Sequence, residues 1–157
     1  MPEGREKILE GVAGLSRTTV ANDVNPADVL KEINYKALES LPDAIIVINR
    51  KGEIVVFNHQ AELMFGYDRV EVFGKLIEVL IPEAIRNNHV ASRNGYFNTP
   101  RVREMGTGMQ LRGRDRYGNE FGVQISLSAM VVMGAGTHAM AVIRRVKEES
   151  NKNEDHA

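Results

Sequence analysis

The chain has 157 residues, of which 43% are hydrophobic and 26% are charged, a composition typical of one globular domain with appendages. The formal net charge of −1 offers no bulk attraction to nucleic acid or to an anionic membrane, so neither is expected as a direct partner. The absence of cysteine excludes disulfides and cysteine-based metal or flavin-adduct sites. The apolar runs are too short to span a membrane and the N-terminus lacks a signal-peptide pattern, so we expect a soluble cytoplasmic protein.

Residues 1–40 are predicted to form a helical cap and dimerisation segment. Ile8, Val12 and Leu15 share one face of a first helix that several glycines weaken. A second helix starts where Asn25 stands at the N-cap and Pro26 at the first helical position. Its apolar stripe consists of Leu30, Ile33, Ala37 and Leu41.

Residues 41–67 predict a strand, a turn, a second strand and a helix. The runs 44–48 and 54–57 are apolar, and residues 49–52 between them have turn chemistry with a glycine at the end. Asn58 stands where the N-cap of a helix belongs, and Gly66 where that helix would close.

Short helical segments are predicted next. Asp68 and Glu71 have the spacing of a capping box, and Pro82 is expected to begin a longer helix that runs to about residue 97. On that helix His89 shares a face with Ile85, Ser92 and Tyr96, so it stands where an apolar residue would be expected.

The residue pattern changes to a period of two after position 105. Alternation over 105–111 and 121–127 predicts two paired antiparallel strands around a turn at 116–119. A turn at 134–136 leads into a last strand, and residues 147–157 form a charged tail. The element order therefore predicts an α+β fold.

Both faces of the first and last strands are apolar, so the N-terminal helix or a second subunit is expected to cover the outer face.

From about Ala37 to Val146 the sequence resembles the PAS sensory domains. The resemblance rests on LPDAIIVINRKGEIVVFN, on AELMFGY with Gly74 and Lys75 after it, and on GRDRYGNEF followed by VQISLSAM. It implies that residues 41–146 form a five-stranded antiparallel sheet with short helices on one face around a ligand pocket. It also implies that a signal leaves through the outer face of the sheet and the flanking helices, by homodimerisation or by binding a protein of a signalling pathway.

Within that family the chain is most similar to haem-binding PAS domains of oxygen sensors. Those domains carry Leu-x-Pro, then three residues, an arginine, two residues and the histidine that binds iron, and residues 80–89 match this spacing. The resemblance implies that His89 is the haem ligand, with Met105 and Met109 on the facing strand. Position 109 is arginine in the oxygen-sensing kinases. The remaining cofactor-binding positions are expected at Ile85, Tyr96, Leu111, Ile125 and Leu127.

Simpler interpretations stay open beside the haem hypothesis. His89 can be a hydrogen-bonded core histidine, and the two methionines can be core filler. The arginines at 101, 103, 112, 114 and 116 can hold propionates or only solvate strand edges. The chain would then be a ligand-free adaptor that acts through protein association.

We expect no enzyme, because no nucleophile and base constellation appears. Residues 145–147 lack the Asp-x-Thr turn that leads to an effector in many PAS proteins, and no effector domain is expected to follow.

Overall fold

The computed structural model describes residues 25–101, 103–105 and 111–147. The chain divides into two compact units, residues 1–38 and residues 39–157, and each is described by itself. The first predicted helix, around Val12, and most of the charged tail lie outside the described residues.

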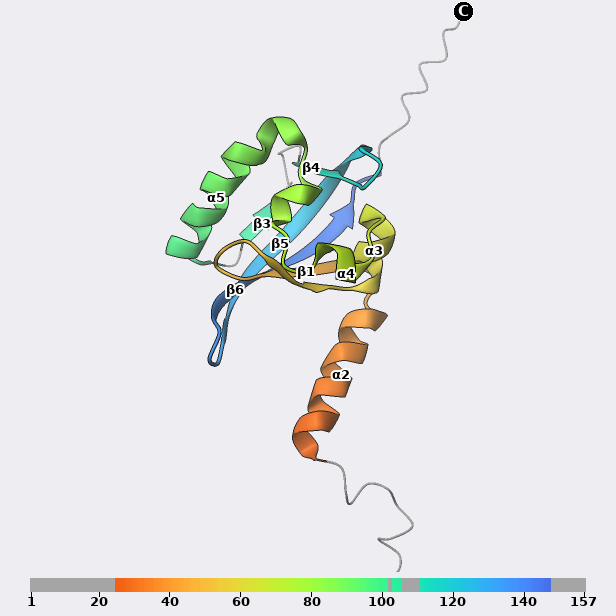
Figure 1. The fold of residues 1–157 in the computed structure, drawn as a ribbon, viewed down its shortest axis with the longest axis vertical. Helices are drawn as coiled ribbons and strands as arrows, with labels where there is room; N and C mark the ends of the chain where they lie inside the picture. Colours follow the sequence, from red (N-terminus) through yellow and green to blue (C-terminus); the bar gives the residue numbers. More distant parts are fainter. Residues whose placement is uncertain (1–24, 102, 106–110, 148–157) are drawn as a thin grey trace, which may run out of the picture. The chain divides into compact units, whose positions relative to one another are not determined.

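Helix α2, Pro26–Ser40, is the described part of the N-terminal segment (Figure 1). It is capped as predicted, because the Asn25 side chain accepts a hydrogen bond from the backbone N–H of Ala27 at 3.0 Å. Ile33 and Ala37, two members of the predicted apolar stripe, are exposed. No helix in the described part of the chain is long and apolar enough to cross a membrane.

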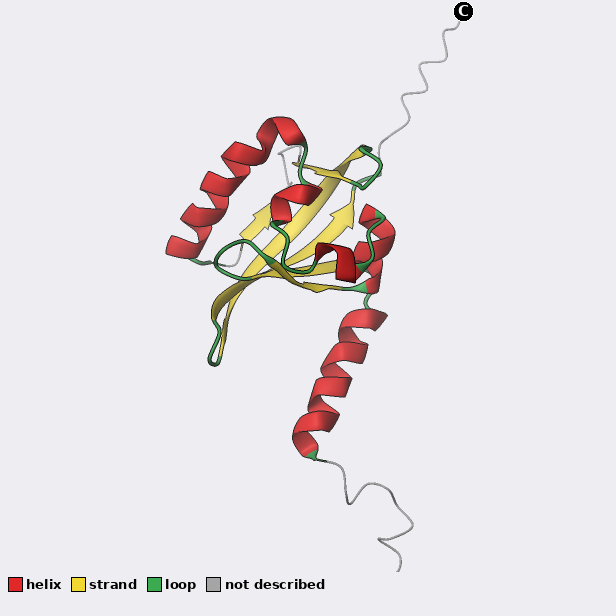
Figure 2. Ribbon diagram, in the orientation of Figure 1, coloured by secondary structure: helices red, strands yellow, loops and turns green. Residues whose placement is uncertain are grey.

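An antiparallel sheet is the framework of the second unit (Figure 2). The strands follow the order β2-β1-β6-β5-β3, and β4 also pairs with β5. Because β3 and β4 pair with successive parts of β5, they share one position, and the five-position antiparallel sheet that was predicted is confirmed. The strands are β1 Ala44–Ile48, β2 Ile54–Phe57, β3 Arg103–Met105, β4 Leu111–Arg114, β5 Glu120–Val132 and β6 Gly136–Arg145.

Short helices gather on one side of this sheet (Figure 2). The helix that was predicted to start at Pro82 is divided into two parts, a 3-10 turn and then α5. Ile85, with φ −113° and ψ 4°, separates the two parts, so the predicted start at Pro82 is four residues before the observed start of α5 at Arg86. The helices are α3 His59–Phe65, α4 Arg69–Val72, η2 Ile77–Leu80, η3 Glu83–Ile85 and α5 Arg86–Asn98.

The hydrophobic core lies between the short helices and the inner face of the sheet. Strand register brings Ile46 of β1, Ile143 of β6 and Val123 of β5 to this face. A row of tilted aromatic rings fills the space above them, with the Phe65 centroid 6.3 Å from that of Phe57 and 5.6 Å from that of Phe121. The outer face is apolar as well, and it carries Ile45 and Val47 of β1 and Met140 and Val142 of β6.

The hairpin of β5 and β6 extends past its neighbours as a two-stranded ribbon (Figure 1). The pairing of β1 with β6 stops at Ala139, and that of β3 with β5 stops at Leu127, whereas β5 and β6 pair as far as Val132 and Gly136. The tip of the ribbon is exposed, and Met133 there is 99% accessible.

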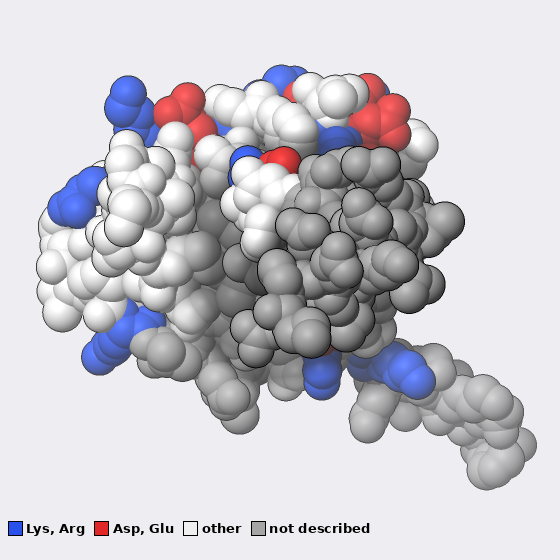
Figure 3. Space-filling model, turned by 90° about the horizontal axis from the view of Figure 1, so that it is seen from below, with Lys and Arg blue, Asp and Glu red and all other residues white. Residues whose placement is uncertain are grey.

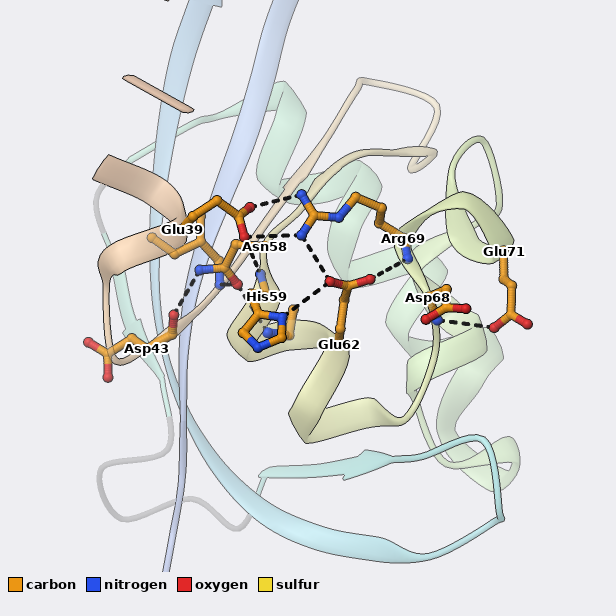
Figure 4. A network of polar contacts seen from close by, with 10 residues as sticks. Glu39, Asp43, Asn58, His59, Glu62, Asp68, Arg69 and Glu71 are labelled. Carbon is orange, nitrogen blue, oxygen red and sulfur yellow. Dashed lines mark hydrogen bonds and ion pairs between the residues drawn. The ribbon is translucent and has the colours of Figure 1, made fainter. Parts of the chain in front are cut away.

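Asn58 joins β1 to the start of α3 (Figure 4). Its side chain is 1% exposed and forms hydrogen bonds with backbone groups of Asp43, Ile45 and Ala61. The Oδ1 atom accepts from the backbone N–H of Ile45 at 2.8 Å and from that of Ala61 at 3.0 Å, and the Nδ2 atom donates to the Asp43 carbonyl at 3.0 Å. One buried amide therefore caps α3 and fixes the chain where it enters β1.

Arg69 of α4 connects α3 and α4 to the residue that opens the second unit (Figure 4). Its guanidinium donates to both oxygens of Glu39, at 2.9 and 3.0 Å, and to Oε1 of Glu62 at 2.9 Å. The bonds to Glu39, and then those to Glu62, raise the pKa of Arg69, and the bond from Arg69 lowers the pKa of Glu62. This network fixes α3 and α4 to Glu39 at the start of the second unit.

Charged side chains are mixed in sign on the face shown in Figure 3, where lysine and arginine lie among aspartate and glutamate. Several basic residues of the second unit are already paired with acids, such as Arg116 with Glu71 and Arg144 with Asp43. On that face the described residues form no single-sign patch of the kind that binds nucleic acid.

Replacing Asn58 by alanine is expected to lower the free energy of unfolding of the second unit by roughly 2–4 kcal/mol. The substitution removes the cap of α3 and leaves two buried backbone N–H groups, those of Ile45 and Ala61, without this hydrogen-bond acceptor. Asn25→Ala provides the matched control, since it removes an exposed cap on α2 and is expected to cost under about 1 kcal/mol. Urea denaturation followed by circular dichroism measures both. Equal effects of the two substitutions would contradict the role given to Asn58.

Candidate functional site

A small apolar cavity lies between the inner face of the sheet and the helices η2 and α5. Its volume is about 100 Å³. Aliphatic side chains form most of its wall, and His89 and Arg112 are the polar side chains that border it. The cavity is bordered by Phe65, Ile77, Leu80, Ile81, His89, Arg112, Gly113, Val123, Ile125, Leu127, Ala141 and Ile143.

The strand part of the wall follows from alternation along β5 and β6. Val123, Ile125 and Leu127 are every second residue of β5 and therefore point to one face. Antiparallel register sets Ile143 beside Ile125 and Ala141 beside Leu127 on that same face. The structure thus brings Ile125 and Leu127, two of the predicted cofactor-binding residues, to the cavity.

His89 reaches the cavity from the first turn of α5. Its Nδ1 atom lies 2.9 Å from Oε2 of Glu78, which belongs to η2. Glu78 is only 6% exposed, whereas the His89 side chain is 32% exposed. A buried carboxylate therefore holds the imidazole whose ring borders the cavity.

Arg93 supplies the counter-ion for Glu78. It stands one turn after His89 on α5, is 8% exposed, and donates through Nε at 3.3 Å and through Nη2 to the two oxygens of Glu78. A third donor, Nη1, binds the Lys51 carbonyl at 3.0 Å in the turn between β1 and β2. The pair is charge-balanced and bridges three segments of the chain.

The guanidinium of Arg93 lies directly against Gly52. The backbone of Gly52 has φ +84°, and a Cβ atom built there would come within 2.3 Å of the Arg93 Cζ. Glycine is thus needed at this position both for the left-handed backbone and for the space that the buried arginine occupies.

The other predicted cofactor-binding residues either lie away from the cavity or have side chains that are not described. Ile85 is 44% exposed and does not border the cavity, and Leu111 packs at the edge of the core outside the wall. Met105 ends β3 opposite Ile125, but its side chain is not described, and Met109 lies outside the described residues. The expected thioether ligands therefore stay predictions.

Tyr96 is two turns along α5 from His89 and does not border the cavity. Its hydroxyl is buried, and in the described structure it has no hydrogen-bond partner. Burial raises the pKa of this phenol. An unpaired buried hydroxyl is uncommon in folded proteins.

Sequence reasoning missed Glu78 and Arg93. The spacing of Arg93 four residues after His89 puts the two on one side of the helix, which is a usable signal. The position of Glu78 next to both has no sequence signal, since it depends on how η2 packs against α5. Gly113 was also missed; a Cβ there would come within 3.1 Å of the Phe65 ring and 3.2 Å of the Phe121 ring.

The donor set fits the axial ligation of a haem, but the space is small. A histidine whose second nitrogen is bonded to a carboxylate is the usual arrangement of a metal-bound imidazole. No group of three or more potential metal ligands occurs among the described residues. At about 100 Å³ the cavity is below the ~300–1,000 Å³ of sites for drug-sized molecules, so a haem would require its walls to move apart.

Comparisons with known proteins agree with this architecture. A sequence model of one family, described as the PAS fold, matches residues 34–146. The sensor protein FixL of Bradyrhizobium diazoefficiens is 33% identical over 93 residues, which cover 59% of this chain and 18% of that protein. The oxygen sensor protein DosP of Escherichia coli is 31% identical over 124 residues, which cover 78% of this chain and 15% of that protein. The chain therefore spans less than a fifth of either relative.

A solved structure gives the same fold. The crystal structure of the PAS domain of an HTR-like protein from Haloarcula marismortui has a TM-score of 0.63 and 21% sequence identity, and it covers 76% of this chain and 99% of that domain. At this identity the likeness concerns the arrangement of strands and helices.

Gly52→Ala is expected to lower the free energy of unfolding by roughly 2–4 kcal/mol, because the new methyl group collides with Arg93 in addition to straining the backbone. Gly74→Ala is the matched control, since Gly74 has φ +76° and no atom within 4 Å of the added Cβ, and should cost only roughly 1 kcal/mol. Thermal unfolding of the two variants tests the claim, and a similar loss in both would show that Arg93 does not fill this space.

Proposed function

Because the chain belongs to the PAS family, we propose that it senses a small molecule in the cavity beside His89 and passes the signal on through protein association. PAS domains are sensory modules, and this chain carries the family fold over most of its described length. The observation that carries the proposal is one imidazole, held by the buried Glu78, at the wall of an apolar cavity.

Haem is the ligand that we propose first, with His89 as its axial ligand through Nε2. Support comes from the Leu-x-Pro to histidine spacing of residues 80–89 and from the similarity to a protein named an oxygen sensor. The iron of a bound haem would supply a centre for a diatomic gas. Ile125 and Leu127, which border the cavity, would pack against a bound haem, and Met105, Met109 and Tyr96 stay proposed contacts of it.

Titration of the purified chain with haemin tests this ligand. We expect a sharp Soret band in the wild-type chain and its loss, with roughly tenfold or weaker binding, in His89→Ala. His59→Ala is the control, because His59 is exposed on α3 and away from the cavity wall. A chain that stays colourless after reconstitution, or a Soret band that His89→Ala leaves unchanged, would overturn the haem proposal.

Homodimerisation is the proposed output, and it is also what a ligand-free adaptor would use. The observation that favours it is the unburied apolar stripe of α2, where Ile33 is 56% exposed. A second copy would cover that stripe. On the outer face of the sheet, Ile45 and Val47 are already buried in the single chain.

Substitution of Ile33 by aspartate is expected to convert a dimer into a monomer, because a charge would be buried at the centre of the stripe. Tyr35→Asp is the matched control: Tyr35 is 57% exposed, and it points about 200° around the helix from Ile33. Light scattering at micromolar concentration measures the mass. A wild-type chain that is monomeric, or a dimer that both variants leave intact, would refute this assembly.

A further inference from the structure

We propose that Glu78 fixes His89 in the tautomer that is protonated on Nδ1, so that the cavity presents Nε2 as an electron-pair donor. The Nδ1 atom is 2.9 Å from Oε2 of Glu78. Both oxygens of Glu78 also accept hydrogen bonds from Arg93, and an ionised carboxylate paired with arginine has no proton to give. The hydrogen between Glu78 and His89 must therefore reside on the imidazole.

The orientation of the ring assigns the second nitrogen to the cavity. His89 borders the cavity, whereas Glu78 and Arg93 do not. The Nδ1 edge of the ring faces this buried ion pair, so the opposite edge, which carries Nε2, faces the cavity. In a neutral imidazole protonated on Nδ1, Nε2 holds the lone pair. Within the described structure no residue donates a hydrogen bond to it.

A lone pair at the wall determines which ligands are accepted. At Nε2 the cavity should bind a molecule that offers an O–H or N–H donor or a metal ion, and it should bind more weakly a molecule whose single polar group is an acceptor. Arg112 also borders the cavity, but its Nη2 atom donates to the Glu120 carbonyl at an exposed position between β4 and β5. An arginine side chain can only donate, so among the side chains that border the cavity His89 is the one that can accept a hydrogen bond from a ligand.

The volume limits the size of a ligand in the described conformation. At about 100 Å³ the cavity is somewhat smaller than an engineered apolar cavity of ~150 Å³ that binds benzene. A single aromatic ring with one donor group, such as phenol, is thus the upper limit of ligand size, and its entry requires a small movement of the cavity walls. This ligand class rests on the proposed sensory role of the cavity, whereas the tautomer rests only on the contacts of Glu78.

Nitrogen-15 NMR of the chain labelled at histidine measures the tautomer directly. The chain has 4 histidines, and the His89 signals are those that disappear in His89→Gln. In alkaline buffer we expect His89 to show a protonated Nδ1 and an unprotonated Nε2. Glu78→Gln should shift population toward the Nε2-protonated form, since an amide can donate as well as accept. Protonation of Nε2 in the wild-type chain overturns the proposal even if Glu78→Gln fails to fold.

The ligand class is tested with phenol and anisole, which share one ring and differ in the O–H donor. Phenol should move the His89 Nε2 resonance in a saturable manner, and anisole should bind roughly tenfold more weakly or not at all. If phenol and haemin both leave this resonance unchanged in the Nδ1-protonated chain, the ligand class is wrong. If phenol shifts the resonance but haemin gives no Soret band, the haem proposal is wrong and the proposed ligand class is supported.

Discussion

The side-chain amide of Asn58 is the constraint on which the second unit depends. At 1% exposure it is shielded from bulk water, so the backbone groups that it bonds must be in place at the same time. Those partners are the entry to β1, the second residue of β1 and the first turn of α3. Once they meet, α3 lies across the inner face of the sheet, and Phe65 at its end becomes one wall of the cavity.

The pair formed by Glu78 and Arg93 positions the part of the cavity wall that contains His89, as Asn58 positions the part that contains Phe65. Removing two charges from water is costly, and the cost is offset only when each charge has well-placed partners. Arg93 binds Glu78 and a carbonyl of the turn between β1 and β2, and the remaining capacity of Glu78 is directed to His89. The position of the imidazole is thus a by-product of neutralising a buried ion pair, which gives the site a stiffness that a lone histidine on a helix would lack.

Much of the fold could be predicted because its signals are local. Caps at Asn25 and Asn58, the left-handed glycines Gly52 and Gly66 and the alternation of β5 each involve a few neighbouring residues. The site was only partly predictable. A continuous helical period from Pro82 set Ile85 on the face of His89, but the change from 3-10 to α geometry at Ile85 rotates that residue out to solvent. The meeting of Glu78 with Arg93 depends on packing between segments, which local patterns do not encode.

The ribbon formed by β5 and β6 beyond Ala139 has a dynamic consequence. There each strand has a single neighbour, and side chains such as Val131 and Met133 pack against little. Isolated two-stranded ribbons are at best marginally stable in water. This end of the sheet should therefore open without unfolding the rest, and its amide hydrogens should exchange with solvent faster than those of Ile125 or Ile143 in the same two strands.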